Sequence, residues 1–238
     1  MVKIASKHLI EDIKVLSICF YKSLEAKLGF LIPLVMFAFS LIELILRFKY
    51  GIELIAKELA LTPENIWGIL TYGLIHADFS HLIENFIGFI ALSIMLSIIL
   101  AIAFLSTPKK ERTLKLIILG KIYSHIVVLG YFPAGLVSYV FVVLGILKEP
   151  VVGASGITYA IIGYFIVAIM FMFNRVLAKL KTNIRITIIV IVGFIMISIL
   201  ARDIIESIGG NINYIAHLTS LCLGITYSIT RICKIEEA

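Results

Sequence analysis

One short stretch, Gly153-Ala154-Ser155-Gly156, places a serine among small residues at the start of a membrane-length apolar run. Glycines on both sides let backbone approach the hydroxyl closely, and the N-terminal end of a helix favours negative charge. These are conditions under which a serine serves as a nucleophile. Small residues at the end of a membrane helix also let neighbouring helices pack closely, so this stretch alone leaves both interpretations open.

A second set of polar residues lies at or just inside the edges of other apolar segments: His76, His81, Asn85 and His217. Polar residues in or near membrane spans are costly and indicate function by default. His81 and Asn85 are four residues apart, so on a helix they share a face and can donate hydrogen bonds toward one point. His76 can approach from the side. The alternative for each residue is a structural role, in which it satisfies backbone groups where the loop enters the membrane.

The composition is that of a membrane protein. Of 238 residues, 61% are hydrophobic and 15% are charged, and the mean hydropathy is +1.10, whereas soluble domains are about 25% charged. Apolar runs of about 20 residues indicate spanning helices, not the short alternating strands of a barrel. We therefore expect an all-α, polytopic membrane protein. The net charge is +6, and the basic residues lie in clusters between the apolar runs. They therefore indicate which loops face the cytoplasm, and they predict no nucleic-acid partner.

Six spans are expected within a membrane domain of residues 28–231. They cover approximately residues 28–46, 81–105, 122–147, 155–173, 186–200 and 213–230. The stretch 114–147 is interpreted as an interfacial start followed by one span, with two short spans as the alternative. Pro108 to Arg112 indicates a solvated turn ahead of it. Residues 1–27 predict an amphipathic helix on the inner leaflet, and residues 232–238 a short charged tail.

The distribution of Lys and Arg predicts the orientation. These residues are concentrated in the N-terminal segment, in the turns after the second and fourth spans, and in the tail. Both termini should therefore be cytoplasmic in a cell-membrane protein. This orientation places His76, His81, Ser155 and His217 in the non-cytoplasmic half of the helix bundle.

The spacing also predicts how Ser155 is activated. Ser155 and Tyr159 share a face of the fourth span, and His217 lies at a comparable depth in the sixth. If these spans pack together, His217 can accept the Ser155 proton while Tyr159 stacks on the imidazole. No acid lies at the right depth to complete a triad, so the predicted unit has two members. The Ser155 backbone N–H, with His81 and Asn85, would form an oxyanion hole.

Other chemistries lack the residues they need. A zinc protease would need H-E-x-x-H, which is absent, and the three cysteines have no ligand spacing. An intramembrane aspartyl protease would need two aspartates within spans, but Asp12, Asp78 and Asp203 lie outside span interiors. No Walker loop or dinucleotide fingerprint is present. We expect neither a metal nor a cofactor.

The motifs occur in a characteristic order: His76-x4-His81-x3-Asn85, then Gly153-Ala154-Ser155-Gly156 with Tyr159, then Ala216-His217 ahead of small residues. Together they resemble the rhomboid family of intramembrane serine proteases, and the resemblance extends from Trp67 to Gly224. It implies a prokaryotic-type core of six helices, with Ser155 as nucleophile and His217 as general base. It implies oxyanion or supporting roles for His76, His81, Asn85, Gly153, Ala154 and Tyr159.

The resemblance also implies a partner: a single-pass membrane protein, held in lipid and cleaved within or beside its transmembrane helix. The alternative is an inactive rhomboid-like protein that binds transmembrane helices, although the presence of both Ser155 and His217 favours the enzyme. A transporter would show internal repeats or broken helices, and the sequence shows neither. Nothing in the sequence predicts the oligomeric state.

Two positions depart from the family pattern. In the loop between the first and second spans, here called the first loop, the family often has Trp-Arg, where this chain has Trp67 and Gly68. The guanidinium that would brace this loop is therefore absent, and a weaker brace is expected. In the sixth span, Ser220 stands where the family has glycine, ahead of Gly224. Serine is still small enough for close helix contact.

Overall fold

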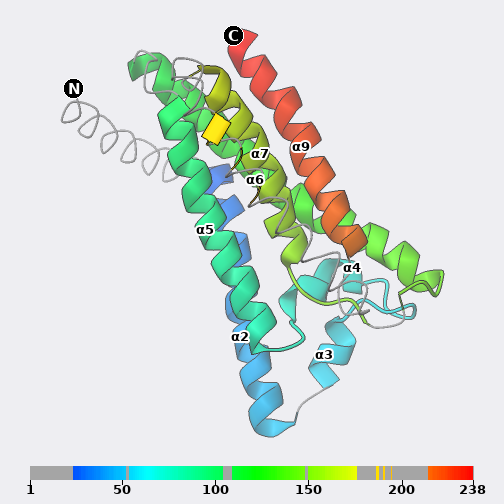
Figure 1. Ribbon diagram of the computed structural model, residues 1–238. Helices are drawn as coiled ribbons and strands as arrows, with labels where there is room; N and C mark the ends of the chain where they lie inside the picture. Colours follow the sequence, from blue (N-terminus) through cyan, green and yellow to red (C-terminus); the bar gives the residue numbers. More distant parts are fainter. Residues whose placement is uncertain are drawn as a thin grey trace.

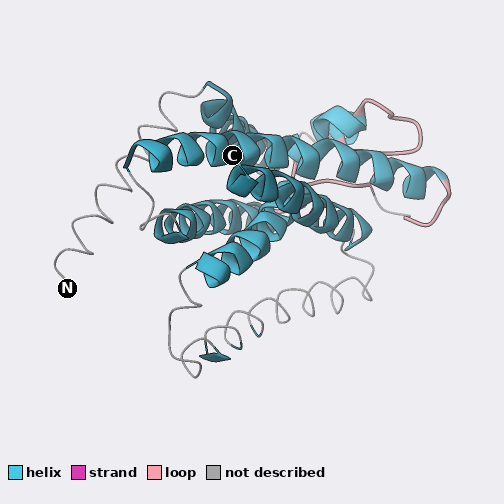
Figure 2. Cartoon of the chain, turned by 90° about the horizontal axis from the view of Figure 1, so that it is seen from above, coloured by secondary structure: helices cyan, strands magenta, loops and turns pink. Residues whose placement is uncertain are grey.

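The computed structural model describes residues 24–51, 54–103, 109–147, 150–175 and 214–237, together with residues 186, 187, 190 and 194. Within these residues the chain forms helices and no strand: α2 Leu24–Tyr50, α3 Leu54–Leu59, α4 Gly68–Thr71, the 3-10 helix η1 Tyr72–Leu74, α5 Phe79–Ala103, α6 Lys109–Val143, α7 Ser155–Arg175 and α9 Tyr214–Glu237 (Figure 1). Figure 2 shows the same helices from above, with the loops gathered at one side. The predicted all-α class is confirmed.

Four of the described helices are long and apolar enough to cross a membrane. They are Lys27–Tyr50, Phe79–Leu100, Ile117–Val143 and Ser155–Met172, and they match the first four predicted spans. The predicted sixth span forms the 24-residue helix α9, which is not among these four. The predicted fifth span, 186–200, lies outside the described residues except at four helical positions. The number six therefore stays a prediction.

The ends of the chain bear on the predicted domain boundaries. The predicted amphipathic segment 1–27 lies outside the described residues except for its last four, which open α2. At the other end, α9 continues through Glu237, so most of the predicted tail 232–238 is a continuation of that helix.

Helix α6 is one continuous helix of 35 residues, so the interpretation as a single span is confirmed and the two-span alternative is wrong. The predicted solvated turn is also wrong from Lys109 onward, because the helix already begins there. Glu111 lies in the first turn, where negative charge is favourable, and its carboxylate pairs with Lys115 Nζ at 2.9 Å. At 1.5 Å per residue the helix is about 50 Å long, longer than a bilayer core.

Helix α7 is the central helix. It passes between α5 and α9 (Figure 1) and also packs against α6. In α7, 78% of the apolar span is buried, against 28–44% in the other three candidate spans. The protein therefore holds the helix that begins with Ser155 away from lipid and surrounds it with the others.

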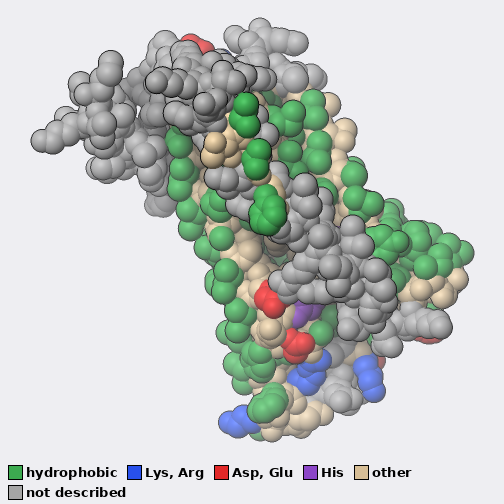
Figure 3. All heavy atoms as spheres, viewed as in Figure 1, with side chains coloured by type: hydrophobic (Ala, Val, Ile, Leu, Met, Phe, Trp, Pro, Cys, Tyr) green, Lys and Arg blue, Asp and Glu red, His purple; other side chains and the backbone are tan. Residues whose placement is uncertain are grey.

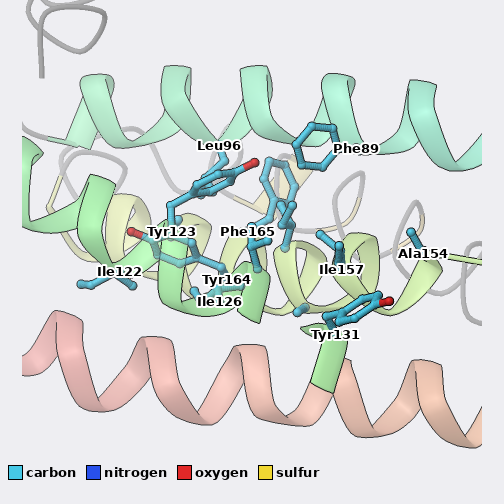
Figure 4. Packing of buried hydrophobic residues seen from close by; sticks show 14 of the residues in the cluster. Phe89, Leu96, Ile122, Tyr123, Ile126, Tyr131, Ala154, Ile157, Tyr164 and Phe165 are labelled. Atoms are coloured by element: carbon cyan, nitrogen blue, oxygen red, sulfur yellow. The ribbon is translucent and has the colours of Figure 1, made fainter. Parts of the chain in front are cut away.

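The core between α5, α6 and α7 is rich in aromatic residues. Figure 4 shows Phe89 and Leu96 of α5, Tyr123 and Ile126 of α6, and Tyr164 and Phe165 of α7 meeting there. Phe89 and Tyr164 are completely buried. The buried hydroxyls are satisfied, as expected for tyrosine in an apolar core: Tyr123 OH lies 2.7 Å from Ser93 Oγ, and Tyr164 OH donates to the Leu119 carbonyl at 3.4 Å.

Small residues bring α6, α7 and α9 into backbone contact. A Cβ added to Gly163 of α7 would lie 2.5 Å from the Leu221 carbonyl oxygen of α9, and one added to Gly224 would overlap the backbone of Ala160. The hydrophobic effect does not favour helix association within lipid, so close packing of this kind stabilises the association. Ser220 fits this contact, as predicted, and it does more: its hydroxyl donates to the Gly130 carbonyl of α6 at 3.0 Å.

The surface divides by polarity. Figure 3 shows apolar side chains along the length of α5, where Ile83, Ile87 and Ile94 are exposed. Charged side chains and a histidine gather at the end where α2 finishes and α5 begins. The apolar surface along α5 is suited to contact with lipid. The polar end is where the candidate site residues of the first loop lie.

The α7–α9 contact predicts opposite outcomes for two helical glycine-to-alanine changes. Gly224→Ala should lower the free energy of unfolding by about 1–3 kcal/mol, because its Cβ would overlap the Ala160 backbone. Gly88→Ala is the matched control, because its Cβ would make an ordinary 3.4 Å contact with Thr158, and it should be neutral or stabilise by up to about 1 kcal/mol. Equilibrium unfolding in detergent micelles measures both, and equal effects would contradict the close packing.

Candidate active site

The segment before α7 determines where Ser155 lies at the start of that helix. Gly153 has φ +103°, in the region that favours glycine, and its N–H donates to the Tyr72 carbonyl at 2.9 Å. Ala154 is buried, and its carbonyl accepts from Ile157 N at 3.0 Å, which closes the first turn. Ser155 is the first residue of α7. The hydrogen bonds of Gly153 and Ala154 fix the position of the peptide that leads into it.

Ser155 and His217 lie within hydrogen-bond distance. The Ser155 Oγ is 2.6 Å from His217 Nε2, and His217 lies in the first turn of α9 with 8% of its surface exposed. The Tyr159 ring lies parallel to the imidazole, with centroids 4.2 Å apart and an interplanar angle of 6°. A serine hydroxyl within hydrogen-bond distance of an imidazole nitrogen has the geometry that proton transfer between the two groups requires.

His81 and Asn85 face the peptide that precedes the serine. A Cβ on Gly153 would lie 3.0 Å from His81 Cε1 and 3.7 Å from Asn85 Nδ2. Asn85 is buried, and its Nδ2 has no hydrogen-bond partner among the described residues. Buried donors are normally paired, so this amide is an available donor beside Ser155. The structure thus brings both residues of the predicted α5 face to the site.

His76 lies beside His81. Its ring is 1% exposed, meets the His81 ring edge-on at 5.2 Å, and places Nδ1 3.1 Å from Ser40 Oγ. Burial, reinforced by the neighbouring His81 and opposed by Asp78, lowers the pKa of His76 to about 3. His76 is therefore a neutral ring that supports His81, and no contact joins it to Ser155 directly.

Sequence reasoning missed two residues of this region. Asp78 caps α5, because its Oδ1 accepts from His81 N at 2.8 Å, and an aspartate three residues ahead of His81 is a recognisable capping signal. Thr158 is buried, and its Oγ1 has no hydrogen-bond partner among the residues described. Its spacing of three from Ser155 on one helix face could have indicated it.

The first loop is held by contacts other than an arginine at position 68. There is no room for an arginine side chain, because a Cβ on Gly68 would lie 2.6 Å from Leu61 Cα. Leu61 instead forms two 3.1 Å backbone hydrogen bonds with Val151, just ahead of the serine segment. The rings of Tyr72 and Tyr131 stack at 4.9 Å, and their hydroxyls donate to the Tyr131 and Leu70 carbonyls at 2.8 and 2.9 Å. Backbone and tyrosine contacts thus hold this loop where the family often has a guanidinium, and its rigidity stays a prediction.

No metal site is formed by the part of the chain that the structure describes, since no group of three or more His, Cys, Asp or Glu residues is placed to hold an ion. The chemistry available at this site is that of the serine, the imidazole and the surrounding hydrogen-bond donors.

The position of Gly153 predicts the effect of adding one methyl group. Gly153→Ala should lower the rate at which a fluorophosphonate labels Ser155 by about a hundredfold, because the Cβ would press on His81 and displace the peptide before the serine. Gly145→Ala is the control for an alanine at a positive-φ glycine: its φ is +71°, no atom lies within 4 Å of its Cβ, and it should label at the wild-type rate. Wild-type labelling of Gly153→Ala would contradict the close approach of His81 to this peptide.

The buried state of His76 predicts a pH effect on stability. Unfolded His76 takes up a proton near pH 6.5, whereas the folded residue does so only near pH 3. The free energy of unfolding should therefore fall as pH drops from about 6.5 toward 3, by up to about 1.4 kcal/mol per pH unit. His76→Gln removes this titration, so wild type should lose stability relative to the variant as pH falls from about 6.5 toward 3. A difference that does not change with pH would refute the buried neutral state.

The comparison with known protein families agrees with the motifs and their geometry. The family model of the rhomboid domain matches residues 63–234. No curated protein and no solved structure gives a significant match. The match covers well over half of the chain and includes all the site residues from His76 to His217, and on this ground the chain belongs to the rhomboid family.

Proposed function

We propose that this protein is an intramembrane serine endopeptidase in which Ser155 is the nucleophile and His217 the general base. The observation that carries the proposal is the 2.6 Å distance between Ser155 Oγ and His217 Nε2, which joins the first turns of two different helices, α7 and α9. Rhomboid proteins include proteases and inactive relatives, and a relative without activity has no need to keep both members of this pair in contact.

In the proposed reaction, His217 Nε2 takes the Ser155 proton as Oγ attacks the scissile carbonyl. The imidazolium then gives that proton to the leaving amine, and an acyl-enzyme remains. Water, deprotonated by the same imidazole, hydrolyses it. No carboxylate orients His217 in this scheme. The parallel ring of Tyr159, 4.2 Å away, limits the rotation of the imidazole instead.

The negative charge that develops on the oxygen of the attacked carbonyl must be stabilised by hydrogen-bond donors. The Ser155 N–H at the start of α7 is one, and the helix dipole adds to its effect. His81 and Asn85 are the side-chain donors, and the buried Asn85 Nδ2, which has no partner within the described part of the chain, lies next to the Gly153 peptide. Each donor of this kind is worth about 3–4 kcal/mol in the transition state. Ala154 and Tyr159 support this arrangement by packing.

The proposed substrate is a single-pass membrane protein cut within or beside its transmembrane helix. Ser155 and His217 lie at the first turns of α7 and α9, so they meet at one end of the helix bundle. A helical substrate presents carbonyls that are already hydrogen-bonded, so it must unwind locally before attack. The Lys and Arg distribution supports a cell-membrane location with both termini cytoplasmic and the site toward the opposite face.

The test is cleavage of a reconstituted model transmembrane substrate, followed by mass spectrometry. Ser155→Ala and His217→Ala should each abolish cleavage to a similar floor, and the double variant should be no slower, because members of one catalytic unit are not additive. Ser97→Ala is the control, because it removes a helix hydroxyl that donates to the Ser93 carbonyl at 2.8 Å, and it should cleave at the wild-type rate.

Cleavage that persists in Ser155→Ala would end the serine-protease proposal. A wild-type protein that binds the substrate helix without cutting it would establish the alternative, an inactive rhomboid protein that binds transmembrane helices.

A further inference from the structure

The last turn of α2 carries an arginine that reaches into the first loop. Arg47 Nη2 donates to the carbonyls of His76 and Ala77 at 2.6 and 3.2 Å. These carbonyls belong to the segment that enters α5. Helix α2 ends at Tyr50, and Gly51 follows with φ +64° and donates its N–H to the Arg47 carbonyl at 2.9 Å. Arg47 therefore lies in the last turn of the helix.

A buried carboxylate orients that guanidinium. Glu43, one turn earlier on α2, is 3% exposed, and its Oε1 lies 3.4 Å from Arg47 Nε. Neither carboxylate oxygen has a hydrogen-bond partner among the described residues. Burying an unpaired carboxylate is strongly unfavourable, so the charge of Arg47 is what makes this position tolerable. Arg47 is thus held between Glu43 and two backbone carbonyls.

The same face of α2 also contacts the side chain of His76. Ser40 precedes Glu43 by three residues and Arg47 by seven, so all three lie on one helix face. Ser40 is completely buried, and its Oγ lies 3.1 Å from His76 Nδ1. The helix therefore fixes both the ring and the backbone of His76, which in turn packs against His81.

We propose that Arg47, oriented by Glu43, is a positioning residue for the oxyanion side of the site. It holds the His76–Ala77 backbone, and so the start of α5, at the place from which His81 and Asn85 face Gly153. This proposal rests on the proposed protease function. In this chain the loop position Gly68 has no room for arginine, and a guanidinium from α2 reaches the other end of the same loop.

The test needs variants that do not leave a buried charge behind. Arg47→Ala alone would leave the buried Glu43 carboxylate without its cation, so the main variant combines Glu43→Gln with Arg47→Ala. Glu43→Gln alone keeps the donor to the carbonyls, and Arg47→Lys keeps one positive donor. Lys49→Ala is the matched control, because it removes a cation from the same turn that lies over the Tyr50 ring at 5.3 Å.

Two kinetic readouts report on the site. The double variant should lower kcat for a transmembrane substrate, and the rate of Ser155 labelling by a fluorophosphonate, by about ten- to a hundredfold. KM should change by less than about twofold, because transition-state donors and not substrate binding are displaced. Arg47→Lys and Glu43→Gln should each be intermediate, because the first keeps one positive donor and the second keeps the guanidinium without the carboxylate that orients it. Lys49→Ala should resemble wild type. A double variant with wild-type kcat and labelling rate would overturn the proposal.

Hydrogen–deuterium exchange separates this inference from the proposed function. Amides of residues 76–82 should exchange faster in the double variant than in Lys49→Ala. Unchanged exchange would overturn the proposal whatever the kinetics show, and faster exchange with unchanged kcat would overturn the positioning role. If wild-type protein neither cleaves nor labels, the proposed function fails, and the exchange comparison then decides alone whether Arg47 orders this segment.

Discussion

The close contact between α7 and α9 is the constraint on which the site depends. Gly163 and Gly224 let the two backbones meet, and larger residues would separate the helix axes. Ser155 and His217 each lie in the first turn of one of these helices, so any separation would lengthen the 2.6 Å distance between them. In lipid, helix association depends on such packing more than on hydrophobic burial, so one feature serves both folding and chemistry.

A second layer of contacts connects the first loop to the serine. Leu61 pairs with Val151, and the Tyr72 carbonyl accepts from Gly153 N, so the loop and the segment before α7 form one hydrogen-bonded unit. The stacked pair of Tyr72 and Tyr131 joins this unit to α6. A loop held by such hydrogen bonds serves as a scaffold of the site, because it fixes the peptide that leads into Ser155.

Hydropathy and spacing predicted much of this arrangement. Runs of apolar residues gave α2, α5 and α7, and a spacing of four correctly placed His81 with Asn85 and Ser155 with Tyr159 on common faces. The start of α6 could not be predicted, because charges around Glu111 fit a solvated turn as well as a helix end. The role of Gly68 was also hidden, since the sequence does not show that Leu61 backbone fills the space an arginine would need. Contacts between distant residues, such as Arg47 with His76, depend on helix packing that periodicity does not specify.

The hydrogen bond from Ser220 to the Gly130 carbonyl has an evolutionary consequence. A hydroxyl introduced into an apolar helix contact needs an acceptor, and Gly130 lets α6 pack tightly here, because a Cβ at this position would lie 2.7 Å from the Gly156 carbonyl oxygen of α7. The two positions are therefore coupled in inheritance. A lineage that enlarges Gly130 would be expected to return residue 220 to glycine or alanine, so these positions should vary together across related sequences although they lie 90 residues apart in the chain.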